Sequence, residues 1–188
     1  MKRAICMFSA LIFAAFSCSA PDPIHDDAVA KLGPEKGSAN EFHRAGQPCG
    51  TCHSAKTGPA KTDFSVAGTV FATPASLVGV ENATIAMVDS AGTSPDPVTT
   101  NCVGNFFIAR SAWDPVLPIT SVTIALGATT VKMKSPIGGT ASCATCHLAT
   151  TAPPNPQTKL GAVWLFDPAS APPPPSSSCP VSPDLGVK

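Results

Sequence analysis

The chain has 188 residues, with 12 Lys and Arg against 12 Asp and Glu, and charged residues make up only 13% of it. This length predicts one domain of ordinary size or two small ones. The sparse and balanced charge excludes a basic surface for nucleic acid. Pro (21) and Gly (14) favour short strands and turns over long helices. Eight cysteines in a chain of this size indicate either an oxidising compartment or a cofactor.

Residues 1–17 have the form of an export signal. Lys2 and Arg3 precede the apolar stretch Ala4–Phe16, which is too short for the ~20 residues that a membrane span needs. The end of this stretch and the two residues after it, Ala15-Phe16-Ser17-Cys18, resemble a lipobox. In a lipobox the cysteine becomes the lipidated first residue of the mature chain. We therefore expect a signal peptide over residues 1–17 and a lipid on Cys18 that anchors the protein in the periplasm or at the outer membrane. Plain secretion is the alternative.

Residues 18–40 are interrupted by Pro and Gly and predict a tether. Beyond residue 63, short β-branched runs alternate with turn clusters, which is typical of strands with one buried face. The runs are Phe64–Phe71, Ala83–Val88, Val98–Thr100, Phe106–Ala109, Ile119–Leu126 and Thr129–Met133. They predict a mainly β fold, with a β-sandwich over residues 64–134. The Pro- and Ser-rich residues 167–188 predict a loose tail.

The sandwich region resembles a known family. Gly68-Thr69-Val70, the run from Asn82 to Asp89, and Gly104-Asn105-Phe106 are similar to the carboxypeptidase-regulatory-like (transthyretin-like) sandwich family. The usual Thr-Asp-x-x-Gly-x-Phe turn of that family has Asn101 in the place of the Asp. The resemblance implies a sandwich fold and no catalysis.

Two C-x-x-C-H motifs flank the sandwich region and have the form of c-type haem attachment sites. Two thiols three positions apart on a short helical turn lie on one side and can form thioethers with one porphyrin, and the next histidine then faces the iron. The motifs are Cys49-Gly50-Thr51-Cys52-His53 and Cys143-Ala144-Thr145-Cys146-His147. They predict haem-binding segments at residues 41–63 and 135–166, with four thioether cysteines and proximal ligands His53 and His147. The lead Phe42–Pro48 resembles the His-Arg-x-Gly-Gln lead of some multihaem cytochromes.

Three rival interpretations of the motifs are weaker. A zinc site from two C-x-x-C pairs usually has ~15 to 20 residues between the pairs, whereas 90 residues lie between Cys52 and Cys143. A thioredoxin-like redox pair needs a βαβ setting that a β-rich chain lacks. Structural disulfides within the motifs leave the repeated histidine unexplained.

The sixth iron ligand of a cytochrome c is His or Met. His43 lies in the lead before the first motif and is the leading candidate, followed by Met133, which precedes Cys143 by ten residues. Met87 alternates with Ile85 in a predicted strand and is expected in the core, and His25 lies in the predicted tether. We expect the first haem to be bis-His and the second to be His/Met or open.

These observations predict an exported dihaem cytochrome c that transfers electrons between periplasmic or cell-surface partners. A haem enzyme or a gas or peroxide sensor with one open iron is an alternative, and so is a surface scaffold or adhesion protein with structural haems. The cysteine count agrees with two haems. Cys6 leaves with the signal peptide and Cys18 takes the lipid, so Cys102 and Cys179 remain, and we expect them to form a disulfide.

Overall fold

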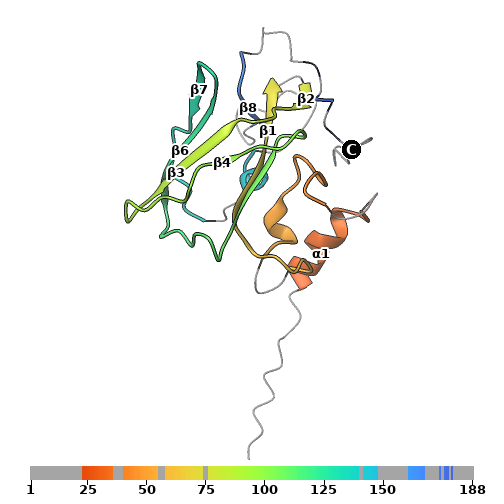
Figure 1. Cartoon of the computed structure of the whole chain (residues 1–188). Coiled ribbons are helices and arrows are strands. Elements are labelled where there is room, and N and C mark those ends of the chain that lie inside the picture. The colour runs from red at the N-terminus through yellow and green to blue at the C-terminus, as the bar shows by residue number, and fades with distance from the viewer. Residues whose placement is uncertain are drawn as a thin grey trace, which may run out of the picture.

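The computed structural model of the chain describes residues 23–35, 40–54, 58–73, 76–139, 142–147, 161–167, 174, 176, 177 and 179. The expected signal peptide, residues 1–17, and the expected lipid site at Cys18 lie outside these residues. Two β-sheets pack on each other with few helical residues (Figure 1). The predicted mainly β fold is therefore confirmed.

Strand β1 (Phe64–Thr73) is the centre of one sheet. It pairs in antiparallel fashion with β2 (Ser76–Gly79) and β5 (Asn105–Ala109), and in parallel with β8 (Val163–Trp164). The second sheet has the order β4-β3-β6-β7, in which the neighbours are antiparallel. Its strands are β3 (Thr84–Asp89), β4 (Val98–Thr99), β6 (Ile119–Leu126) and β7 (Thr129–Lys132).

The core lies between the sheets and joins β1 and β5 to β3 and β6. Its buried apolar residues include Val66, Val70, Ile85, Met87, Phe106, Ile108, Ile119, Val122 and Ile124. Strand β3 alternates as expected, because Ile85, Met87 and Asp89 are buried while the side chains between them are more exposed. Met87 is thus a core residue, as predicted.

Strand β1 differs from β3 because it is buried from Ser65 to Thr73 without interruption. A strand in a two-layer sandwich normally has one solvated face. Here the segments that carry both C-x-x-C-H motifs contact β1 as well. The central strand is therefore enclosed between the core and the motif-bearing segments.

Two strands were not predicted from the sequence. β2 has four half-buried residues, and β8 has two residues inside the segment that was assigned to the second motif, residues 135–166. Leu165, next to β8, is 3% exposed and lies in the sandwich core, and its N–H donates to Phe71 O at 3.1 Å. The sandwich therefore takes in residues beyond 134. The apolar run from Ala162 to Phe166 carries this signal.

The segment expected to be a tether contains helix α1 (Pro23–Lys31), which lies beside the first motif (Figure 1). Proline is well suited to the first helical position because its φ is already helical and no N–H is needed there. Lys31 Nζ lies 2.5 Å from Asp27 Oδ2, one turn earlier. His25 Nε2 lies 2.6 Å from Thr51 O. No helix among the described residues is long and apolar enough to cross a membrane.

The structure also joins part of the C-terminal tail to the sandwich. A disulfide links Cys102, in the turn between β4 and β5, to Cys179, with the two Cα atoms 5.4 Å apart. The Ser176 hydroxyl donates to Glu81 Oε2 at 2.5 Å. Cys102 and Cys179 are the two cysteines that the haem and lipid assignments leave over.

Candidate functional site

The two C-x-x-C-H motifs have the same local structure. Each begins with one turn of 3-10 helix, η1 (Cys49–Thr51) and η2 (Cys143–Thr145). The N–H of His53 donates to Cys49 O at 2.9 Å, and the N–H of His147 donates to Cys143 O at 2.8 Å. In both motifs the histidine therefore follows directly on a closed turn that contains the two cysteines.

The imidazole rings of both motifs are held in the same way, through a hydrogen bond from Nδ1 to a backbone carbonyl. Nδ1 of His53 lies 2.8 Å from Thr62 O, and Nδ1 of His147 lies 3.0 Å from Gly161 O. A carbonyl can only accept, so each Nδ1 carries the proton and donates it. The lone pair is then on Nε2, which is the arrangement found in histidines that bind metals.

A cavity of about 300 Å³ opens beside the first motif. Cys49, Cys52 and His53 line it, and His43 lines it too. Much of the remaining wall is apolar, from Leu32, Pro48, Phe64, Ala67, Phe106 and Phe107. Two thiols, two imidazoles and aromatic walls are a suitable donor set and lining for a porphyrin.

Both motifs lie against the same few residues of β1. Ser142, which precedes the second motif, forms a parallel bridge with Ala67, and Ala67 lines the cavity of the first motif. Gly68 lies so close to Cys143 that a Cβ there would be 2.8 Å from its Sγ. Burial raises the pKa of the Cys143 thiol to about 12, and the nearby Cys49 thiol acts in the same direction. The two attachment sites are therefore neighbours.

Aromatic rings continue from the first motif to the surface. The ring of His53 stacks on Phe64 with centroids 3.9 Å apart, and Phe64 stacks on Phe107 at 4.6 Å. Phe107 is 44% exposed. Phe64 thus shields one face of the histidine from water, and Phe107 brings the stack to solvent.

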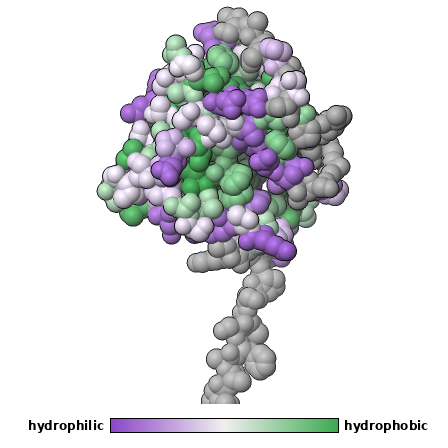
Figure 2. Space-filling view, viewed as in Figure 1, coloured by the Kyte–Doolittle hydropathy of each residue, from purple (hydrophilic) through white to green (hydrophobic). Residues whose placement is uncertain are grey.

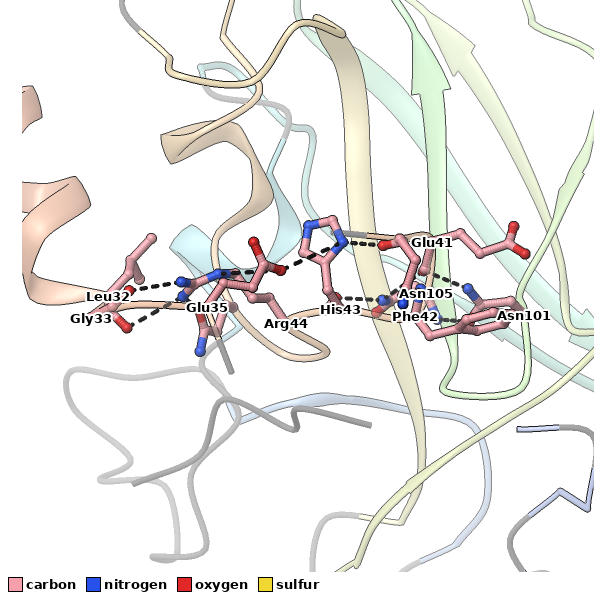
Figure 3. A network of polar contacts seen from close by, with 11 residues as sticks. Leu32, Gly33, Glu35, Glu41, Phe42, His43, Arg44, Asn101 and Asn105 are labelled. Carbon is pink, nitrogen blue, oxygen red and sulfur yellow. Dashed lines mark hydrogen bonds and ion pairs between the residues drawn. The ribbon is translucent and has the colours of Figure 1, made fainter. Parts of the chain in front are cut away.

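Three of the residues between Phe42 and Pro48 hold this lead in place. Arg44 donates to Leu32 O at 3.3 Å and to Gly33 O at 2.7 Å, so it joins the end of α1 to the first motif (Figure 3). Ala45 is fully buried against the Cys102–Cys179 disulfide. Gly46 has a φ of +80°, which favours glycine, and its N–H donates to Thr69 Oγ1 of β1 at 2.8 Å.

The candidates for the sixth iron ligand differ in their surroundings. The ring of His43 faces that of His53 with centroids 6.0 Å apart, and its Nδ1 contacts Asn40 O. His25 differs because its Nε2 is the atom that contacts a carbonyl, Thr51 O. Met133 packs against the sandwich core and is not among the described residues that line the cavity.

Comparisons with protein-family models, with curated protein sequences and with solved structures find no match for this chain. Among the described residues, no three His, Cys, Asp or Glu side chains converge to hold a metal ion. Sequence reasoning did not assign Phe64, Gly68, Thr69 or Asn105 to the site. They belong to the sandwich in the sequence pattern, and only the fold brings them to the motifs.

Proposed function

We propose that the chain is an exported dihaem cytochrome c that transfers electrons. The observation that supports this proposal best is the duplicated geometry of the motifs. In each, two cysteines lie on one turn and the following histidine directs Nε2 away from a backbone carbonyl. A fold that needed only two disulfides or two buried thiols would not require that histidine arrangement twice.

The cysteines and histidines of the motifs have different roles in this proposal. Cys49, Cys52, Cys143 and Cys146 would hold two porphyrins as thioethers, and His53 and His147 would each bind an iron through Nε2. A haem supplies one-electron redox chemistry when it is bound. Phe64 and Phe106 line the cavity and would limit the access of water to the first haem.

Strand β1 would set the separation of the two sites. Ala67 lines the cavity of the first motif and bridges to Ser142 beside the second, and Gly68 contacts Cys143. Because β1 is buried along its length, these residues have little freedom to move. We infer that electrons exchange between two closely spaced sites within one molecule.

His43 is the proposed distal ligand of the first haem. His43 and His53 both line the cavity of the first motif, and their ring centroids are 6.0 Å apart. His43 would therefore hold the iron together with His53. His25 is less suitable because its Nε2 contacts Thr51 O.

The proposed partners are electron donors and acceptors of the periplasm or cell surface, and a lipid on Cys18 would hold the protein near them. Apolar residues gather in the middle of the face shown in Figure 2, with hydrophilic residues around them. With 12 charges of each sign, long-range attraction is weak. Electron-exchange rates should therefore depend little on ionic strength, and a steep dependence would contradict this.

The test is expression in a host that matures c-type cytochromes, followed by acid-acetone extraction and a redox titration with optical detection. We expect two haems per chain that survive extraction. Cys49→Ala with Cys52→Ala should remove one of them, and Cys143→Ala with Cys146→Ala the other. A colourless wild-type protein would refute the proposal.

A second candidate function is ligand binding at the second iron. Outside the motifs, the chain after residue 18 has only His25, His43, Met87 and Met133 as possible ligands. Met87 is buried, Met133 packs on the core, and His25 and His43 lie near the first motif. An open second iron would bind carbon monoxide in the reduced protein, whereas a His/Met site would show a charge-transfer band that Met133→Ala removes.

A further inference from the structure

Two asparagines, Asn101 in the turn between β4 and β5 and Asn105 at the start of β5, use both the oxygen and the nitrogen of their carboxamides in hydrogen bonds. Asn101 Oδ1 accepts the N–H of Val103 at 3.2 Å and the N–H of Asn105 at 3.0 Å. The N–H of Gly104 donates to Asn101 O at 2.8 Å. The oxygen of the Asn101 side chain therefore builds the turn itself, which an aspartate could do equally well.

The nitrogen atoms of the same carboxamides point away from the turn, toward the lead of the first motif (Figure 3). Asn101 Nδ2 donates to Glu41 O at 2.7 Å, and Asn105 Nδ2 donates to His43 O at 3.0 Å and to Glu41 O at 3.3 Å. An aspartate has no N–H to give and would place a negative oxygen against these carbonyls. Asparagine at these two positions thus supplies hydrogen-bond donors that aspartate lacks.

The side-chain oxygen of Asn105 links this network to Thr69 of β1 and, through Thr69, to Gly46 of the lead. Asn105 Oδ1 accepts the hydroxyl of Thr69 at 2.7 Å, and Thr69 Oγ1 accepts the N–H of Gly46 at 2.8 Å. The backbone is consequently held at Glu41, His43 and Gly46 by the turn and β1. The imidazole of His43 is fixed in addition by its contact with Asn40 O.

We propose that Asn101 and Asn105 are positioning residues that hold His43 in place as the distal ligand of the first haem. This role rests on the proposed function. It explains why asparagine stands at position 101, where the family that the sandwich resembles has aspartate. That substitution leaves the turn intact and adds a donor that faces the motif. The sandwich thereby acts on the ligation of the first site, beyond keeping the two sites apart.

The test uses the haem-loaded full chain with four single variants. Asn101→Asp and Asn105→Asp keep the side-chain size and the oxygen acceptors but remove the donors. Asn82→Asp is the matched control, because Asn82 is exposed in another turn and has a left-handed φ of +60° that aspartate tolerates. His43→Ala reports the signal of an absent distal ligand.

Carbon monoxide binding to the reduced protein, the potential of the first haem and amide exchange of residues 42–47 are the readouts. For each donor lost, we expect the carbon-monoxide-reactive fraction and the amide exchange to rise about fivefold. The signals of the second haem should stay as in the wild type, and Asn82→Asp should match the wild type throughout. A residue that served only the turn would change thermal stability without changing the potential.

The outcomes separate this role from the proposed function. Wild-type carbon monoxide binding in both Asn101→Asp and Asn105→Asp, together with a rise in His43→Ala, would overturn the positioning role alone. If His43→Ala itself changes nothing while two haems are counted, His43 is not the ligand and the positioning role falls, but the cytochrome stands. A protein without covalent haem would overturn both.

Discussion

The two motif-bearing segments have the same turn but are fastened to the sandwich by different means. The first is held largely by side chains of the sandwich, since Asn101, Asn105 and Thr69 bond its backbone. Arg44 bonds it in turn to Leu32 and Gly33, just after α1. The second is held by backbone and close packing, through the bridge from Ser142 to β1 and the contact of Cys143 with Gly68. The same local turn can therefore be supported either by a network of polar side chains or by close packing.

Loss of the disulfide should have the largest effect, and it should fall on the first segment. Cys102→Ala with Cys179→Ala opens a cross-link between residues 77 apart in the chain, and we expect a loss of about 2–5 kcal/mol in the free energy of unfolding. Ala45 and Phe42 pack against this disulfide, so amide exchange should accelerate over residues 42–47. Chemical denaturation and amide exchange measure the two effects.

The control for that variant is Ser176→Ala, which removes the contact of the tail with Glu81 but leaves the cross-link. It should cost less than about 1 kcal/mol. Equal losses in the two proteins would show that the cross-link itself contributes nothing.

A methyl group at Gly68 should disturb the second segment instead. In Gly68→Ala the new Cβ would lie 2.8 Å from Cys143 Sγ and Cβ, and such overpacking costs about 1–3 kcal/mol. We expect a lower melting temperature and less than two haems per chain, with the loss at the second motif. Gly139→Ala adds the same methyl group where nothing lies within 4 Å, and it should leave the haem count unchanged.

Removal of one hydroxyl should weaken the first segment by a smaller amount. Thr69→Val keeps the shape of the side chain but leaves the N–H of Gly46 and the oxygen of Asn105 without this partner. The expected loss is about 1–2 kcal/mol. Thr69→Ser retains the hydroxyl and should restore most of the stability and the wild-type spectrum. A Thr69→Val protein as stable as the wild type would show that the polar network is not what fixes the first segment.

The smallest effect on the two motif-bearing segments should come from Asp89, because it ends β3 in the sheet that does not contain β1. Its carboxylate accepts hydrogen bonds from Thr93, Val116 and Ala91, and the bond from the Thr93 hydroxyl contributes most to a pKa below the usual value. A depressed pKa stabilises the fold above the unfolded pKa of about 4, and this contribution is lost as the pH falls through the folded value. The melting temperatures of wild type and Asp89→Asn should therefore converge below pH 4. Both segments should respond alike.

Much of the fold follows from the sequence because the long strands of the second sheet are β-branched runs, and β3 alternates regularly between buried and exposed residues. Ile85, Met87 and Asp89 are buried in turn, and β6 has the predicted bounds Ile119–Leu126. β8 was missed because two residues are too few to show a period, and its partner strand is nearly a hundred residues away. α1 was missed because its proline and charged residues leave no apolar face, and it is stabilised by contacts with the first motif.

The candidate site divides in the same way. The thiols and histidines of the motifs are adjacent in the sequence, so local spacing is enough to predict them. Phe64 reaches the site because the chain folds back onto His53, and Gly68 and Asn105 reach it through the packing of the sandwich. No local pattern distinguishes these three from other sandwich residues. Asn101 likewise reaches the first segment only in the folded chain, where its Nδ2 donates to Glu41 O.

The parallel pairing of β8 with β1 bears on the order in which the protein is assembled. β1 is made early, yet two of its hydrogen-bonding neighbours, Ser142 and β8, lie on either side of the second motif in the chain. The sheet can be completed only after the second motif has been synthesised. Under the proposed function, a cofactor attached to Cys143 and Cys146 during synthesis would be in place before Val163 and Trp164 close the sheet.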